Sequence, residues 1–385
     1  LLSNFLVYRS FTLLYIGTHR MNCHENSCRR HDMTFTSLRI IPLVIACLAI
    51  GPEVSLAHHS VAGFFDEEKK AEIEGVVKKV HWRNPHTVFE VDVTSDTGEV
   101  VTWRIESGAL GVLRSRGLAR EFMQPGENIR IMGDSSLRSD NEMFARNILL
   151  PNGKEVVLTA GSFPYFTVES DADILEAVYD EDLIAAARKN ADGIFRVWSS
   201  NIDDRTSDRR KMFNGNYPLL PAAIAARANY DAGDQALLGC TSWSMPRIMS
   251  NPLPMEFVKS GENILQRFEE DDNVRTIYMK SDSSGSPVEP SALGYSTGRW
   301  EGETLIVETS GLIPDRIDNL GTPSSAEMRL TEHFSVSENG NRLDYVLTMS
   351  DPNTFSDPVE RPRHWDWRPE IVVSAYNCEQ DQELK

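Results

Sequence analysis

The sequence lacks the features that mark several large protein classes. It has no glycine-rich phosphate loop and no regular alternation of strands with helices, which argues against a nucleotide-binding α/β fold. Basic residues are scarce: 39 Lys and Arg stand against 57 Asp and Glu, for a formal net charge of −18. Such a charge repels polyphosphate, so nucleic acids and anionic membranes are poor partners.

A long hydrophobic run is also absent, although a short one lies near the N-terminus. After Met33, Arg39 supplies a positive charge, residues 40–50 form an apolar run, and Ser55-Leu56-Ala57 is a small-x-small cleavage site. A membrane-spanning helix needs about 20 apolar residues. We therefore interpret this run as a signal peptide, with no transmembrane segment in the chain that follows it.

This interpretation predicts how the chain is processed. Residues 1–32 are expected to be an upstream extension from a mis-called start, and residues 33–57 the signal peptide. Cleavage near Ala57 would make His58 the first residue of a periplasmic or secreted protein. An alternative places cleavage at a lipoprotein box that ends at Cys47.

Cysteine is rare in the rest of the chain. Of five cysteines, only Cys240 and Cys378 follow the predicted signal peptide. In an oxidising compartment a single remaining pair is expected to form a disulfide. Two buried free thiols are the alternative.

Short stretches with alternating apolar residues fill the first half of the processed chain. The strands expected there are 71–82, 86–93, 98–106, 127–133 and 142–150. A short helix is expected within 108–123. Three strands, a helix and two strands is the order of an OB fold. We therefore predict an OB-fold-like five-stranded barrel over residues 58–160.

A helical connector is predicted over residues 161–235. Apolar residues recur at helical spacing within 171–193, after an Asp cap and before Gly193, and another short helix is expected within 221–231.

Strands return in the last part of the chain, residues 236–385. They are expected at 263–270, 273–280, 302–310, 326–336, 341–349 and 370–376. In the fifth, Leu343, Tyr345, Leu347 and Met349 share one face. The pattern predicts an antiparallel β-meander or barrel closed by the disulfide, in a mainly β protein.

Several motifs in the first half resemble a family of secreted bacterial proteins of unknown function, over residues 58 to about 155. The motifs are His58-His59-Ser60, Trp82-x-Asn84-Pro85-His86, Trp103-x-x-Glu106 and Leu113-x-x-x-Gly117. The resemblance carries no known activity.

The second half, from about residue 193 to 385, is similar to another uncharacterised family. It shares Pro246-Arg247-Ile248-Met249, the block Gly298 to Leu305 (GRWEGETL), Asp351-Pro352 and Tyr376-x-Cys378. That family's usual Gly-His-Ser is replaced here by Gly294-Tyr295-Ser296.

The polar faces of two predicted OB strands suggest a binding surface. Strand parity puts His86 on the polar face of the second strand and Arg104 and Glu106 on that of the third, and in OB folds these faces commonly bind ligands. The predicted ligand contacts of this domain are Trp82, Asn84, His86, Arg104 and Glu106.

The same region supports a metal hypothesis. A freed His58 would offer its α-amine and ring nitrogen together, an arrangement that suits Cu(II). Copper or zinc held by His58, His59 and His86 is therefore the alternative to simple ligand binding, although no cofactor is predicted outright. Against it, residues 58 and 59 could be a disordered end and Asn84-Pro85-His86 a turn.

Two charged residues lie on apolar strand faces in the second half. Arg275 shares its face with Ile277 and Met279, and Glu332 alternates with Leu330 and Phe334. A buried unpaired charge is costly. We expect Arg275 and Glu332 to pair, either as a structural ion pair or as the polar anchor of a ligand cavity.

One motif resembles the nucleophile elbow of serine hydrolases. Gly294-Tyr295-Ser296-Thr297-Gly298 fits G-x-S-x-G, but the elbow requires a strand that turns into a helix, and the residues that follow it are typical of a turn and a strand.

Together these observations favour non-catalytic binding of a small or extended ligand by two β domains, with no catalytic residues predicted. A copper or zinc protein is the alternative, and a serine hydrolase acting through Ser296 comes third.

Overall fold

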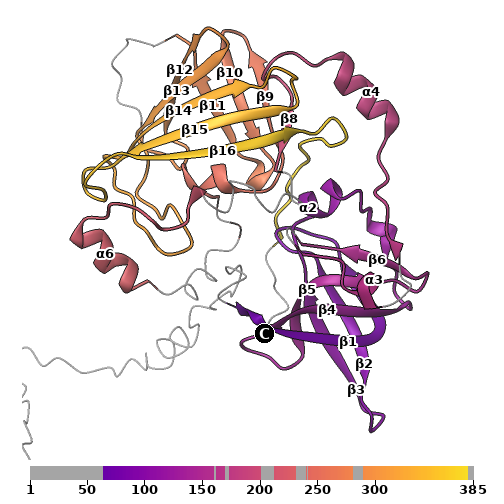
Figure 1. The fold of residues 1–385 in the computed structure, drawn as a ribbon. Helices are drawn as coiled ribbons and strands as arrows, with labels where there is room; N and C mark the ends of the chain where they lie inside the picture. Colours follow the sequence, from indigo (N-terminus) through magenta and orange to yellow (C-terminus); the bar gives the residue numbers. More distant parts are fainter. Residues whose placement is uncertain are drawn as a thin grey trace, which may run out of the picture. The chain divides into compact units, whose positions relative to one another are not determined.

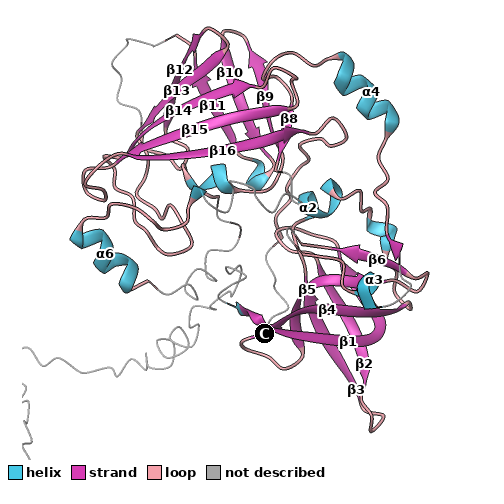
Figure 2. Ribbon diagram, viewed as in Figure 1, coloured by secondary structure: helices cyan, strands magenta, loops and turns pink. Residues whose placement is uncertain are grey.

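The computed structural model describes residues 64–159, 162–169, 173–200, 212–230, 240, 242–280 and 289–379. The protein is mainly β and contains two sheets that each close on themselves (Figure 1). Helices in the described residues are short and lie between or beside the strands (Figure 2). The predicted fold class, an OB-like five-stranded barrel followed by an antiparallel barrel, is confirmed.

The first barrel is a ring of five strands. They are β1 (Phe65–His81), β2 (Val88–Thr94), β3 (Val100–Glu106), β4 (Asn128–Ser136) and β5 (Glu142–Leu149). β1 pairs with β2 and β4, β2 pairs with β3, and β4 pairs with β5. A parallel pairing of β3 with β5 completes the ring. Helix α2 (Leu110–Ser115) and the 3-10 turn η1 (Arg120–Phe122) connect β3 to β4, as in an OB fold.

The interior of this ring follows from the two-residue period of its strands. In β1, Ile73, Gly75 and Val77 are buried, while Glu72, Glu74 and Val76 between them are exposed. Burial of each large aliphatic side chain contributes about 1.5–3 kcal/mol. Gly75 and Gly133 mark places where backbones approach closely: a Cβ on Gly133 would lie 2.3 Å from the carbonyl oxygen of Phe144.

Two short strands extend the first sheet beyond β5, and two helices lie in the same stretch of the chain. The strands are β6 (Lys154–Val157) and β7 (Asp173–Ile174), and the helices are α3 (Phe166–Glu169) and α4 (Glu181–Lys189). The helix expected within 171–193 is shorter than predicted, because Asp173 and Ile174 pair with β6. Asp180, rather than an earlier aspartate, caps it by accepting hydrogen bonds from the backbone N–H groups of Asp182 and Leu183.

The second barrel closes through nine strands. They are β8 (Val197–Ser199), β9 (Met255–Ser260), β10 (Asn263–Phe268), β11 (Val274–Tyr278), β12 (Tyr295–Glu301), β13 (Thr304–Ser310), β14 (Arg329–Val336), β15 (Arg342–Ser350) and β16 (Val359–Trp367). All neighbours are antiparallel except β11 and β12, which pair in parallel. Around the barrel lie α6 (Pro221–Ala228), η3 (Arg247–Ser250) and η4 (Glu270–Asp272).

The inward residues of the second barrel fill its interior. Leu343, Tyr345, Leu347 and Met349 of β15 share one face, as predicted, and each is at most 1% exposed. Trp198 of β8 and Trp365 of β16 are also buried. The cluster joins residues from all nine strands except β12, whose inward positions are occupied by Ser296 and Gly298.

The structure differs from the predicted strands in several places, and it contains strands that were not predicted, among them β6, β7, β9, β12 and β16. β8 lies within the segment expected to be a helical connector, where it pairs with both β9 and β16. Residues 370–376, expected to form a strand, are irregular, and backbone N–H groups there are bonded by side-chain carboxylates in place of a neighbouring strand. Among the described residues, no helix is both long and apolar enough to cross a bilayer.

A glycine substitution tests the close approach of β4 and β5. Gly133→Ala should destabilise the protein by about 1–3 kcal/mol, because the new Cβ would collide with backbone rather than with a movable side chain. The matched control is Gly108→Ala, whose Cβ would meet Val112 at an ordinary 3.4 Å and should change stability by less than about 1 kcal/mol. Urea unfolding followed by tryptophan fluorescence measures both. Equal effects of the two variants would contradict the assigned packing.

Candidate functional site

The pairing that closes the first barrel gathers charged residues at one edge. In the parallel ladder of β3 and β5, Arg104 lies opposite Glu142 and Glu106 lies opposite Phe144. Alternate residues of a strand share a face, so Arg104 and Glu106 point to the same side. The loop from β1 to β2, residues 82–87, brings His86 to this edge. In OB folds the β1–β2 and β4–β5 loops border the usual binding surface.

Four of these side chains form a connected set that we call the charged row: His86, Glu106, Arg104 and Glu142. Nδ1 of His86 contacts Oε1 of Glu106. Nη1 of Arg104 donates to Oε2 of Glu106 at 3.1 Å and to Oε1 of Glu142 at 2.7 Å. Ser136 donates from Oγ to the other oxygen of Glu142 at 3.0 Å.

Burial divides the charged row into an anchor and an accessible part. The side chain of Glu106 is 2% exposed, whereas those of His86 and Arg104 are 23% and 22% exposed. A carboxylate taken out of water needs charged or hydrogen-bonding partners; Arg104 supplies a charge and His86 a ring nitrogen in contact. The buried carboxylate therefore holds two cationic or donor groups in fixed positions at the surface.

An aromatic patch adjoins the charged row. Phe64, Phe65 and Phe144 form a small cluster apart from the main core. The ring of His86 meets Phe144 edge-on, with centroids 6.4 Å apart, and the guanidinium of Arg138 lies 3.4 Å from the centroid of Phe64. These three rings are buried, so they support the charged row by packing beside it.

The prediction that His86 and Glu106 share a surface is confirmed in this geometry, and Arg104 joins them. Their role as ligand contacts remains a prediction. Sequence reasoning missed Glu142 and Phe144, because it treated residues 142–150 only as a core strand. The OB topology itself carried the signal, since it places the start of the fifth strand beside the end of the third.

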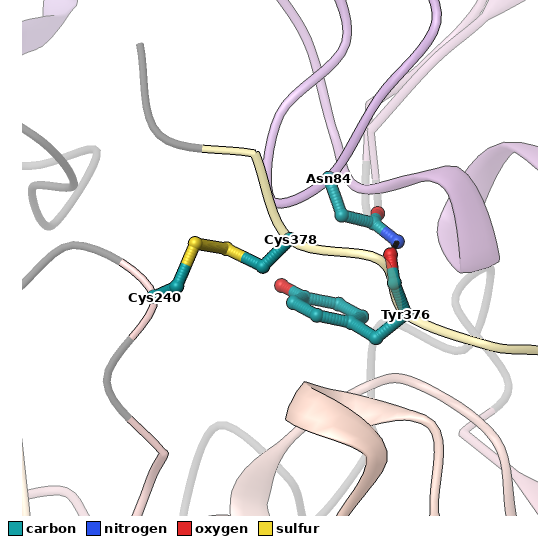
Figure 3. The surroundings of a disulfide bond; sticks show 4 residues. All are labelled: Asn84, Cys240, Tyr376 and Cys378. Atoms are coloured by element: carbon teal, nitrogen blue, oxygen red, sulfur yellow. Dashed lines mark hydrogen bonds between the residues drawn. A yellow bond between two sulfur atoms is a disulfide. The ribbon is translucent and has the colours of Figure 1, made fainter. Parts of the chain in front are cut away.

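Two other predicted ligand contacts, Trp82 and Asn84, lie in packing positions. The ring of Trp82 packs on Phe122, with centroids 6.0 Å apart. Asn84 is fully buried. Its Nδ2 donates to the backbone oxygen of Tyr376 at 2.6 Å (Figure 3), and its Oδ1 accepts from the N–H of Leu110 at 2.8 Å. Asn84 thus makes structural contacts, and its role as a ligand contact remains a prediction.

The residues of the metal hypothesis cannot all be placed. His58 and His59 lie outside the described residues. Among the residues that are described, no three His, Cys, Asp or Glu side chains are grouped so as to hold a metal ion. His86 lies in the charged row, with its Nδ1 directed to Glu106.

The second barrel contains a buried polar network around Arg275. Nη1 of Arg275 donates to Oε1 of Glu332 at 3.1 Å and to Oε1 of Gln266 at 3.1 Å. Its Nη2 donates to Oε2 of Glu332 and to Oγ1 of Thr309, and its Nε donates to Oγ of Ser296 at 2.7 Å. A guanidinium has five N–H donors, and protein side chains accept from all of them here.

Glu332 is satisfied in the same way. Besides Arg275, it accepts a hydrogen bond from the hydroxyl of Tyr345 at 2.9 Å. Burial and the Glu332 charge together raise the pKa of Tyr345 well above its usual value, which keeps the phenol protonated as a donor. The expected Arg275–Glu332 pair therefore exists as a structural ion pair. The network occupies all five donors of Arg275, which supports the structural alternative, and a ligand contact at Arg275 or Glu332 remains a prediction.

The serine hydrolase hypothesis is wrong for geometric reasons. Ser296 lies within strand β12, not at a strand-to-helix turn, and its side chain is fully buried. Its Oγ accepts from Arg275 and lies 3.0 Å from Oγ1 of Thr309. A nucleophile elbow exposes its serine at the surface; here the same motif places the hydroxyl inside a packed barrel.

The two predicted disulfide partners lie together. The Cα atoms of Cys240 and Cys378 are 5.8 Å apart and their sulfur atoms face each other (Figure 3). The backbone of Cys378 also forms an isolated parallel β-bridge with that of Asn84. The C-terminal motif of the second half therefore contacts the Trp82-x-Asn84-Pro85-His86 motif of the first.

The fold and the charged row define a mainly β protein with a candidate binding site at the edge of an OB-type barrel. Residues 45–143 match a family of unknown function, DUF6152. The match covers the strands from β1 to β4 and includes His86, Arg104 and Glu106. No curated protein matches the chain. The resemblance of residues 193–385 to a second family remains a prediction.

Removal of one partner tests the buried pair. Glu332→Gln should cost about 3–5 kcal/mol in the free energy of unfolding, because it leaves the Arg275 charge buried without a counter-ion. Asp344→Asn, at the exposed pair with Arg342, is the control and should cost less than about 1 kcal/mol. Chemical denaturation measures both. A loss below about 1 kcal/mol for Glu332→Gln would refute the structural ion pair.

Proposed function

We propose that this is an exported, non-catalytic binding protein that holds a small or extended ligand at the charged row of its first barrel. One observation carries the proposal: His86 of the β1–β2 loop and Arg104 of β3 both contact the buried Glu106. Arg104 in turn contacts Glu142 at the start of β5. These groups are fixed by one another before any ligand arrives, and preorganisation of this kind reduces the entropic cost of binding.

The chemistry of the site limits the ligand. The strongly negative net charge disfavours polyanions. The row presents both a guanidinium and a carboxylate, and the buried rings of Phe64 and Phe144 support it from behind. A neutral or cationic molecule with hydroxyl or amide groups would match these features.

Copper or zinc binding is the second candidate function. It is favoured by the contact of His86 Nδ1 with Glu106, because carboxylates commonly orient a metal-binding imidazole through its other nitrogen. His58 and His59 would supply the remaining ligands if cleavage occurs near Ala57. Elemental analysis of protein processed in its native compartment separates this candidate from the first, since stoichiometric metal is expected only for the second.

Comparison of retained small molecules tests the binding proposal. Wild-type protein purified from its native compartment should release a bound compound on denaturation, detectable by untargeted mass spectrometry. Arg104→Ala should retain about 10- to 100-fold less, as expected for loss of a charged hydrogen bond worth about 1.5–3 kcal/mol. Arg130→Ala, which alters an exposed pair with Glu72 on the same barrel, is the control.

Two results would count against this function. One is a wild-type protein that retains nothing, and the other is equal retention by all three proteins. Circular dichroism and thermal melting of Arg104→Ala distinguish a lost contact from a lost fold.

Export and disulfide formation are proposed together and tested together. Intact-mass and peptide analysis of the native protein should find His58 as the first residue and Cys240 linked to Cys378, because an oxidising compartment favours the bond between such neighbours. Alkylation before reduction provides the control, since free thiols would be labelled. A retained signal segment or labelled cysteines would contradict the proposed location.

A further inference from the structure

The segment after the last strand, Ile371–Glu379, is held almost entirely by side chains, and we call it the C-terminal strap. The N–H of Ser374 donates to Oε2 of Glu269 at 3.1 Å, and that of Tyr376 donates to Oδ1 of Asp272 at 2.9 Å. Carboxylates thus accept from the strap where a neighbouring strand would do so in a sheet.

The other end of the strap is fixed to the β1–β2 loop. The N–H of Glu379 donates to the backbone oxygen of Asn84 at 3.1 Å, and the Asn84 amide donates back to the oxygen of Tyr376 (Figure 3). Asn84 accepts from Leu110 at the start of α2 through the same amide. The strap therefore holds the β1–β2 loop, which also carries His86 of the charged row.

Four consecutive acidic residues, Glu269–Asp272, lie under the strap and form what we call the acidic tract. Glu269 is fully buried and Glu270 is 7% exposed. Asp271 and Asp272 have φ values of 51° and 53°, in the left-handed region that non-glycine residues seldom adopt. The backbone turns sharply here, and the carboxyl groups are crowded into one place.

Few cations face the acidic tract. Arg114 of α2 pairs with Glu269 at 2.6 Å, and Arg247 of η3 is the cation whose charge acts on Glu270. The remaining polar neighbours of Glu270 are neutral: Asn251 and the hydroxyl of Tyr376 on the strap. Glu269 and Glu270 are buried and Asp271 is partly buried beside them, so ionisation of these neighbouring carboxyl groups is costly.

Apolar surroundings add to this cost. Glu270 lines a small pocket with Asn251, Leu253, Phe268 and Trp365, and the pocket has room for about one water molecule. A carboxylate there would lose most of its hydration.

The pKa values follow from these surroundings. Burial and then the charge of Asp271 raise the pKa of Glu270 from 4.5 to about 8, against hydrogen bonds from Asn251 and Tyr376. Burial and then Asp272 raise the pKa of Asp271 from 3.8 to about 6. Burial also raises the pKa of Glu269, although Arg114 opposes it.

The direction of the pH effect follows from the raised values. The folded protein binds these protons more tightly than the unfolded chain does. The stability of the folded arrangement therefore falls as pH rises from the ordinary carboxyl range through about 6 and about 8.

We propose that the C-terminal strap is a pH-sensitive latch on the β1–β2 loop, seated while Glu270 and Asp271 carry protons and released as they ionise. Ionisation would place negative charge beside Glu269 and Asp272, the carboxylates that hold the strap backbone, and this repulsion acts against the hydrogen bond between Tyr376 and Glu270. Because the Asn84 contacts belong to the same strap, its release frees the loop that carries His86. The latch does not require the proposed ligand.

Hydrogen–deuterium exchange of the full chain tests the latch. Protection factors are compared at about pH 5 and about pH 9 for the peptide over residues 371–379, with a β15 peptide as the reference for global unfolding. Division by intrinsic exchange rates removes the direct effect of pH. Wild-type strap protection should fall at least about tenfold at the higher pH, the change that corresponds to one pKa unit of differential protonation, while β15 stays protected.

Neutral variants identify the responsible groups. Glu270→Gln should keep the strap protected at both pH values, and Asp271→Asn provides a second test should the first variant fold poorly. Asp357→Asn, an exposed carboxyl on the second barrel, should behave like the wild type. The latch is refuted if wild-type strap protection does not change with pH, or if Glu270→Gln and Asp271→Asn lose as much protection as Asp357→Asn.

Discussion

The constraint on which this structure depends is the cost of burying a charge, which hydrogen-bonding or ionic partners must offset. Arg275 meets it completely, because Glu332, Gln266, Ser296 and Thr309 accept all of its donors. The same rule applies in the first barrel, where the buried carboxylate of Glu106 is held by Arg104 and His86 at the rim. The buried polar groups around Arg275 in the second barrel bond one another, whereas the charged row of the first barrel is partly exposed to solvent. That difference is why we place the candidate site on the first barrel.

Strand alternation made much of the fold predictable. Leu343, Tyr345, Leu347 and Met349 stand at every second position, so a strand buries all four by turning one face to the interior. β16 was not predicted, because Pro362 and its charged neighbours obscure the pattern. Residues 370–376 have strand-like composition but no strand partner: the acidic tract captures their backbone, and such a capture depends on tertiary contacts that no local pattern encodes.

The candidate site was predictable only in part. Parity placed Arg104 and Glu106 on one face, and the OB order brought His86 near them. Asn84 lies only two residues before His86, yet it faces the C-terminal strap, which is 292 residues away at Tyr376. Loop residues have no period from which direction could be deduced, so sequence reasoning assigned Asn84 and His86 the same role.

The parallel pairing of β11 with β12 gives the Arg275 network a mechanical meaning. This parallel pairing is short, because only two residue pairs join the strands: Ile277 with Ser296 and Tyr278 with Thr297. Arg275 belongs to β11 and its partner Ser296 to β12. The buried guanidinium therefore links β11 to β12 beside this pairing, and its ion pair with Glu332 links both strands to β14. The parallel pairing of the barrel is thus reinforced by side-chain hydrogen bonds in the interior.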